Sequence, residues 1–251
     1  MQHVRVEHPV DGVAVVTLDD ADRRNSLSVE LCGELTDAIS LLEGDGRTGA
    51  VVVTGEGRAF CAGADLSQLG DSREAGLRTI YEGFLAVARS PLPTLAAVNG
   101  PAVGAGMNLA LACDVRLVGD RGRFDCRFLD LGIHPGGGHT WMLRRIVGPQ
   151  VAAAMLLFGE VLDADSAVGH GLALEHVPGD ALLTRSVELA TGAAGMPHEL
   201  ARAAKATLSE MATIHSHDEA VDHELTKQVH SMDQPAFAER LAALRQKIRS
   251  N

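Results

Sequence analysis

The chain is short of positive charge. Its 251 residues include 22 lysines and arginines against 33 aspartates and glutamates, which gives a formal net charge of −11. Proteins that bind nucleic acid hold the phosphate backbone mainly through clustered lysine and arginine, so the composition argues against a nucleic-acid partner. An anionic small molecule would still require a few local cations.

Patterns that would place the chain outside the cytoplasm are also missing. No uninterrupted apolar stretch reaches transmembrane length, and the opening MQHVRVE lacks the basic and apolar regions of a signal peptide. The four cysteines form no C-x-x-C pair and have no metal-like spacing. We therefore expect a cytoplasmic protein with no membrane span and with reduced thiols, in which Cys61 is a small buried residue.

Motifs of several catalytic classes are absent. There is no G-x-S-x-G nucleophile elbow, and Gly136–Gly138 lacks the lysine and hydroxyl residue of a phosphate-binding P-loop. Histidines crowd one region near the C-terminus, at His215, His217, His223 and His230. Their separations of two, six and seven residues differ from the three or four that helical metal ligands require, so we expect no metal site.

The chain does contain the material for one sizeable core. Its hydrophobic content is 46%, and no Pro/Ser-rich linker divides it. Apolar runs predict strands near residues 4–7, 13–18, 50–54, 94–98 and 115–118. Helical patterns, such as those at residues 28–42 and 72–89, alternate with these strands, which predicts an α/β fold.

Two glycine- and alanine-rich segments follow predicted buried strands. The first loop is GEGRAFCAGADL at residues 55–66, and the second loop is NGPAVGAGMN at residues 99–108, leading into a helix predicted to begin near Gly106. Small side chains let a ligand approach bare backbone amides, and an amide N–H stabilises the negative charge that develops on a thioester oxygen during enolate formation. A helix N-terminus adds partial positive charge. Tight strand-to-helix turns are the alternative interpretation.

The two loops at this spacing resemble the crotonase (enoyl-CoA hydratase/isomerase) family, whose oxyanion hole is built from two such loops. Three further segments resemble family signatures in unbroken order. They are an early coenzyme A segment DRRNSL at residues 22–27, a third glycine-rich turn LGIHPGGG at residues 131–138, and a helix-turn signature DADSAVGHGL at residues 163–172.

The resemblance implies a β-spiral core over residues 1–181, a helical C-terminal region over residues 182–251, and a homotrimer or hexamer. It implies a coenzyme A thioester as substrate, as in fatty acid metabolism, with no permanently bound cofactor. The amides of Ala64 and Ala105 would form the oxyanion hole. Many relatives have glycine where Ala105 stands, and alanine fits there only with a negative φ.

The resemblance also implies which residues contact coenzyme A. In the early segment and the first loop they are Arg23, Arg24, Ala62, Asp65 and Leu66, and near the C-terminus a further basic contact is Arg240. A solvated arginine pair in a turn is the alternative for Arg23 and Arg24.

The chain departs from the family hydratases at both of their catalytic glutamates. Asn108 stands at the first position and Phe128 at the second. A hydratase needs a general base and a general acid, whereas an amide does not titrate and a phenyl ring only shapes an apolar wall. Asn108 keeps the capacity to hold a water or a substrate hydroxyl.

Two nearby groups are candidate substitutes. Asp130 would share a face with Phe128 if the segment is extended. His134 lies inside the third turn, and histidine is the residue type whose ordinary pKa suits acid/base catalysis near neutral pH. Their alternatives are a loop aspartate bonded to local backbone and a histidine restricted by the following proline. Asp125 and Tyr81 are weaker candidates.

Three functions remain open on sequence grounds. The first is an enoyl-CoA hydratase/isomerase-type lyase that stabilises a thioester enolate. The second is a non-catalytic acyl-CoA binding protein that lost the acid/base pair. The third is another crotonase reaction, such as isomerisation, thioester hydrolysis or decarboxylation, that needs one titrating group or none.

Overall fold

The computed structural model describes residues 1–68 and 73–250, so Ser72, the first residue of one predicted helix, lies outside the described part. Contacts divide the chain into two compact units, Met1–Ala194 and Gly195–Asn251. The first unit holds every strand found in the described residues.

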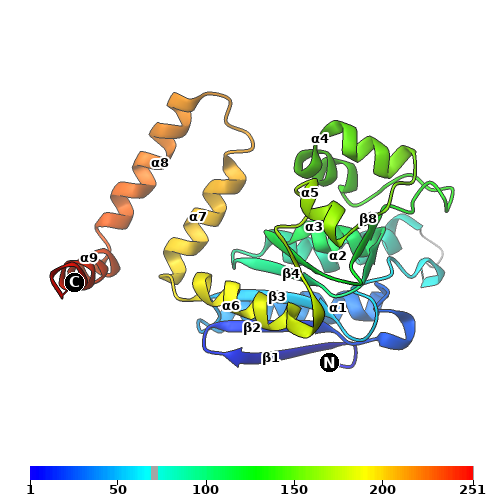
Figure 1. The fold of residues 1–251 in the computed structure, drawn as a ribbon, viewed down its shortest axis with the longest axis horizontal. Helices are drawn as coiled ribbons and strands as arrows, with labels where there is room; N and C mark the ends of the chain where they lie inside the picture. The colour runs from blue at the N-terminus through cyan, green and yellow to red at the C-terminus, as the bar shows by residue number, and fades with distance from the viewer. Residues whose placement is uncertain (69–72, 251) are drawn as a thin grey trace. The chain divides into compact units, whose positions relative to one another are not determined.

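A six-stranded sheet forms the centre of the first unit (Figure 1). Its strands, in spatial order, are β1 (Val4–Val10), β2 (Val13–Leu18), β3 (Ala50–Gly55), β4 (Thr94–Val98), β6 (Val115–Gly119) and β9 (Glu175–Val177). β1 pairs antiparallel with β2, and every later pair is parallel. Because β3 and β4 are parallel neighbours, the loops that follow them both start at the carboxyl ends of the strands, on the same side of the sheet.

Both faces of the central strands are buried, which explains their continuous apolar runs. In β2, Val13 and Val15 face one hydrophobic cluster, whereas Ala14, Val16 and Leu18 face the other. β3 and β4 alternate in the same way between the two clusters.

Helices cover the two faces. On one side lie α1 (Val29–Gly44), α2 (Arg73–Arg89) and α3 (Ala105–Ala112), whose buried side chains join the larger cluster. On the other side α6 (Leu182–Ala194) packs across β2, β3 and β4 (Figure 1). The Ser28 side chain caps α1 by accepting a hydrogen bond from the Leu31 N–H at 3.1 Å.

A smaller sheet and several short elements complete the unit. The sheet pairs β5 (Pro101–Val103), β7 (Arg123–Asp125) and β8 (Leu162–Asp163). α4 (His139–Leu157) is kinked where Gly148 takes φ 76° and Pro149 follows. The other elements are η1 (Ala21–Arg23), η2 (Leu66–Gln68), α5 (Ala164–Gly169) and η3 (Gly179–Ala181).

The predicted α/β fold is confirmed. The strands predicted at residues 13–18 and 94–98 agree with β2 and β4 to the residue, and the others agree within a few residues. The helices predicted at residues 28–42 and 72–89 correspond to α1 and α2, and the helix predicted near Gly106 is α3. From Leu182 onward every regular element in the described residues is a helix, the first of which, α6, packs on the sheet.

The second unit consists of α7 (His198–Glu210), α8 (His217–Met232) and α9 (Pro235–Ser250). Glu210 on α7 accepts hydrogen bonds from His223, at 2.7 Å, and from Lys227, both on α8. Across residues 1–68 and 73–250, no helix combines the length and the apolar content needed to cross a bilayer.

Candidate active site

The first and second loops leave β3 and β4 side by side, and Asn99 joins them at their base. Its amide nitrogen donates to the carbonyl oxygens of Gly55, at 2.7 Å, and Gly57, at 3.2 Å, while its oxygen accepts from the Gly55 N–H at 3.3 Å. The side chain thus takes the place of a strand partner where β3 and β4 separate.

Farther along, the loops hydrogen-bond to each other directly. The Cys61 N–H donates to the Pro101 carbonyl at 3.1 Å, and the Val103 N–H donates to the Cys61 carbonyl at 3.0 Å. A side chain at Gly106 would place its Cβ 2.2 Å from the Cys61 carbonyl oxygen. Glycine is therefore required for this close approach of α3 to the first loop.

Ala64 and Ala105 each follow a glycine with a positive φ. Gly63 has φ 109° and Gly104 has φ 51°, whereas neither alanine has a positive φ, so Ala105 meets the condition set by its sequence. Within the part of the chain that the structure describes, neither alanine N–H donates to an acceptor. Ala105 is the first residue of α3, where the helix leaves N–H groups unpaired and concentrates partial positive charge.

The early DRRNSL segment packs against the first loop. Asn25 is fully buried, with φ 58°, and its amide nitrogen donates to the carbonyls of Glu56, at 3.0 Å, and Ala59, at 2.9 Å. The backbone continues this contact, because the Ala62 N–H donates to the Arg24 carbonyl at 3.0 Å. The segment is thereby fixed beside the loop that contains Ala64.

The two arginines of that segment have different surroundings. Arg23 forms an ion pair with Asp20 at 2.7 Å, and this contact raises the pKa of its guanidinium. Arg24 is exposed, and its side chain forms no ion pair or hydrogen bond with the residues described. Of the pair, Arg24 is the cation with more freedom to meet an external anion.

Three other candidate coenzyme A contacts lie in or directly after the first loop, and a fourth belongs to the second unit. Ala62 is partly buried, Leu66 is exposed at the start of η2, and the Asp65 carboxylate accepts hydrogen bonds from the Ser67 N–H and hydroxyl. Arg240 belongs to the second unit, where it donates to the Gly195 carbonyl at 2.5 Å.

Asn108 and Phe128, which the resemblance aligns with the hydratase glutamates, are both buried. The Asn108 amide nitrogen donates to the Gly136 carbonyl at 3.0 Å, and its oxygen lies 2.7 Å from His139 Nδ1. The Phe128 ring meets the His139 ring edge-on, with centroids 4.8 Å apart. The second loop and the third glycine-rich turn therefore meet at Asn108.

His139 is a residue of this region that sequence reasoning missed. It is buried as the first residue of α4, and its Nε2 lies 3.2 Å from the Cys126 sulfur. Burial lowers the pKa of His139 to about 4 and raises the pKa of the Cys126 thiol to about 12. The sequence feature that could have indicated His139 is its position directly after Gly136–Gly138, where the turn ends and α4 begins.

The candidate substitutes Asp130 and His134 lie apart from this buried group. The extended segment assumed for Asp130 is wrong: the Leu131 N–H and the Ile133 N–H both donate to the Phe128 carbonyl, which forms a turn. Phe128 points inward, whereas the Asp130 side chain is 71% exposed and pairs with Arg127 at 3.7 Å. His134 is also exposed, and its Nδ1 lies 2.7 Å from the Pro135 carbonyl oxygen.

The two weaker candidates have clear surroundings. Asp125 is buried and forms an ion pair with Arg127. The Tyr81 hydroxyl lies against the third turn, since a Cβ built on Gly136 would come within 2.2 Å of its oxygen. Tyr81 therefore approaches the Asn108 contact, whereas Asp125 is held by its own partner.

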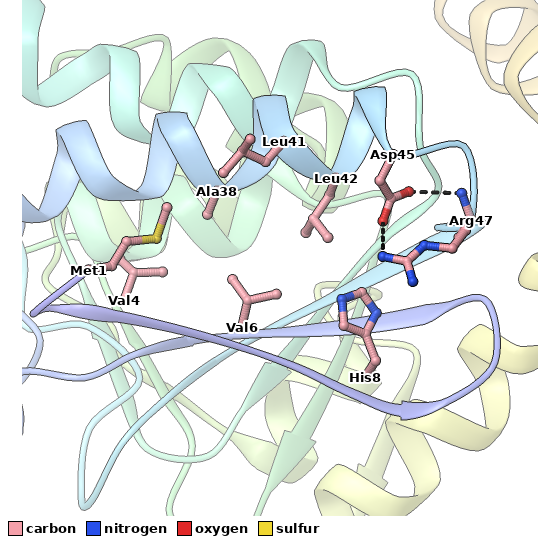
Figure 2. A pocket seen from close by; sticks show the side chains of 9 residues that line it. All are labelled: Met1, Val4, Val6, His8, Ala38, Leu41, Leu42, Asp45 and Arg47. Atoms are coloured by element: carbon pink, nitrogen blue, oxygen red, sulfur yellow. Dashed lines mark hydrogen bonds and ion pairs between the residues drawn. The ribbon is translucent and has the colours of Figure 1, made fainter.

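A separate hollow of about 440 Å³ lies between β1 and α1 (Figure 2). It is lined mainly by apolar side chains, namely Met1, Val4, Val6, Ala38, Leu41 and Leu42, with His8, Asp45 and Arg47 at one end. The Asp45 carboxylate is already engaged by the backbone N–H groups of Arg47 and Thr48 in its own turn. None of the lining residues belongs to the two glycine-rich loops.

The sequence of this chain is similar to a known protein family and to several of its members. The model of the enoyl-CoA hydratase/isomerase family matches residues 9–247. A probable enoyl-CoA hydratase, EchA14, from Mycobacterium tuberculosis is 53% identical over 240 residues, which cover 92% of this chain and 93% of the relative. A 4-chlorobenzoyl coenzyme A dehalogenase from Arthrobacter is 35% identical over 98% of this chain and 91% of the relative.

Solved structures agree with the sequence relatives. The crystal structure of an enoyl-CoA hydratase from Bacillus anthracis superimposes with a TM-score of 0.93 at 28% identity, covering 98% of this chain and 97% of the other. The fold is therefore shared over nearly the whole chain. The chain is a member of the enoyl-CoA hydratase/isomerase, or crotonase, family.

Proposed function

We propose that this protein is an acyl-CoA enzyme that stabilises a thioester enolate with the backbone amides of Ala64 and Ala105. The observation that carries the proposal is the pair of N–H groups without acceptors in the described structure, held on two loops that hydrogen-bond to each other. Two such donors aimed at one carbonyl oxygen favour the charge that develops there. The positive end of α3 adds to the same field.

Coenzyme A supplies most of the proposed binding contacts. Its phosphates require cations, and Arg24 is free to provide one beside the first loop, with Arg23 and the loop residues Ala62, Asp65 and Leu66 as further contacts. Arg240, in the second unit, stays a separate prediction from the family resemblance. The substrate itself is the thioester, and no permanently bound cofactor enters the proposal.

The proposed reaction is not the hydration that a pair of carboxylates catalyses. Asn108 and Phe128 supply neither a general base nor a general acid, so water activation by the family's glutamate pair has no counterpart at these positions. The Arthrobacter relative, named as a dehalogenase of a coenzyme A thioester, supports a reaction other than hydration. Isomerisation, thioester hydrolysis and decarboxylation are the reactions that need one ionising group or none.

A non-catalytic acyl-CoA binding protein is the second candidate. It is favoured by the burial of Asn108, whose amide is already committed to Gly136 and His139. The two candidates share the thioester contacts and differ in turnover.

The test combines turnover with binding. Purified protein is incubated with crotonyl-CoA and a longer trans-2-enoyl-CoA, loss of the enoyl absorbance is followed, and the affinity of each is measured by calorimetry. Tight binding with slow or no hydration supports the proposal, and product analysis with saturated, β,γ-unsaturated and β-carboxylated thioesters then separates an enzyme from a binding protein. Fast hydration would mean that Asp130, His134 or another group replaces the glutamates, and absence of binding would overturn the proposal.

A further inference from the structure

We propose that His139 is a positioning residue of the acyl-CoA site, because it holds the Asn108 amide in the one orientation that ties the third glycine-rich turn to α3. The inference rests on the proposed function, in which α3 presents the Ala105 N–H to the thioester oxygen. His139 does not touch the substrate in this account; it acts through Asn108.

The orientation of the Asn108 amide follows from its two partners. The Gly136 carbonyl oxygen only accepts hydrogen bonds, so the amide nitrogen must face it, at 3.0 Å. The Asn108 oxygen then faces His139 Nδ1 at 2.7 Å. His139 must therefore carry its proton on Nδ1 and donate it to Asn108.

The other imidazole nitrogen completes a consistent set of hydrogen bonds. Nε2 keeps its lone pair and lies 3.2 Å from the Cys126 sulfur, so the thiol donates to it. Both groups stay neutral in their buried surroundings, and Asp125 and Arg127, the ionic residues on either side of Cys126 in the sequence, pair with each other. A neutral imidazole with one donor and one acceptor fits this position, whereas an imidazolium does not.

Asn108 links this hydrogen-bond chain to the oxyanion loop. It stands one helical turn after Gly104, and its own N–H donates to the Gly104 carbonyl at 3.1 Å. The third turn also packs closely here, because a Cβ on Gly137 would lie 3.0 Å from the Asn108 amide nitrogen and 2.4 Å from Phe84 Cζ. Fixing the Asn108 side chain therefore fixes the first turn of α3, including Ala105, against the third turn.

The test measures how strongly binding depends on the thioester carbonyl. The affinities of an acyl-CoA thioester and of the matching thioether, which lacks the carbonyl oxygen, are compared by calorimetry. In H139F the ring packing against Phe128 is kept but the donor to Asn108 is lost. The affinity for the thioester, divided by the affinity for the thioether, should then fall roughly tenfold. Free coenzyme A should bind as it does to the wild type. H139Q restores a donor and should recover much of the ratio, and H170Q, at the exposed His170, should leave it unchanged.

The outcomes separate this inference from the proposed function. If the wild-type protein does not prefer the thioester, the proposed function fails and the inference fails with it. If the wild type shows the preference and folded H139F keeps it, the inference alone is overturned. Nitrogen NMR of the His139 imidazole in the wild-type protein is a second test, which does not require H139F to fold. A protonated Nδ1 with an unprotonated Nε2 supports the inference, and the opposite tautomer overturns it.

Discussion

At the scale of single residues, Arg23 and Arg24 differ in what surrounds them. Arg23 already neutralises Asp20, whereas Arg24 is unpaired among the described residues. We predict that R24A weakens acyl-CoA binding by about 1 kcal/mol, roughly fivefold in Kd, as expected for an exposed charge contact. R23A is the matched comparison and should cost less. Calorimetry at two salt concentrations measures both, and an equal loss in the two variants would contradict the different roles.

Some residues of the candidate site could be predicted from the sequence, and others could not. The loops around Ala64 and Ala105 were predictable because their strands are buried runs and their glycines follow directly. His139 was not, because its partners Asn108 and Cys126 lie 31 and 13 residues away, and only the fold brings them together. Asp130 was misplaced because a turn, not a strand, follows Phe128.

At the scale of elements, the contact between α3 and the first loop depends on a missing side chain. G106A would force a Cβ to within 2.2 Å of the Cys61 carbonyl oxygen, and backbone on both sides leaves little room to move. We predict a loss of about 2 to 3 kcal/mol in the free energy of unfolding and a large loss of thioester binding.

The control lies in a different helix. Gly33 is exposed in α1, and nothing stands within 4 Å of the Cβ it would gain. G33A should therefore raise the free energy of unfolding by about 0.5 to 1 kcal/mol through helix propensity. Denaturant unfolding compares the two variants, and a neutral G106A would show that the loops are not packed as described.

Element boundaries were predictable where burial imposes the pattern. β2 and β4 have both faces covered, so their apolar runs begin and end with the strands. The kink at Gly148 and the short strands β5, β7 and β8 carry no comparable periodicity, because their pairing is set by distant segments.

At the scale of the whole molecule, two histidines should shape the pH dependence of stability in opposite directions. His139 binds a proton near pH 6.5 in the unfolded chain but only near pH 4 in the folded protein, so stability rises with pH across that interval, by at most about 3 kcal/mol. The hydrogen bonds that His176 donates to the Asp165 and Asp120 carboxylates raise its pKa, so its contribution is present at low pH and is lost as pH rises through that pKa.

Urea unfolding between pH 4.5 and 8 tests both effects. In H139F the rise in stability from pH 4.5 to 6.5 should be smaller than in the wild type. In H176Q the loss of stability as the pH rises above the ordinary histidine pKa should be smaller, while the rise at low pH remains. Parallel pH profiles in all three proteins would refute the assignment of either histidine.

Self-association is also expected from the family, as a homotrimer or hexamer. In α7 and α8 no described side chain is buried, and apolar residues such as Leu208, Leu225 and Val229 are exposed in the single chain. Helices without a buried face are marginally stable by themselves. We therefore propose that another copy of this chain packs against the exposed apolar residues of α7 and α8. Light scattering should give three or six chains, and a monomer at micromolar concentration would contradict this.

The proposed oxyanion hole is tested by the carbonyl stretching frequency of a bound acyl-CoA labelled with ¹³C at the thioester carbon. In the proposed function, two N–H donors at Ala64 and Ala105 polarise the C=O bond. We therefore predict that the band moves to lower frequency on binding and that A64P, which removes one donor, reverses much of that shift. The same variant should lose about 3 to 4 kcal/mol of transition-state stabilisation in any reaction the protein catalyses. A bound thioester whose carbonyl band stays at its solution frequency would contradict the oxyanion assignment.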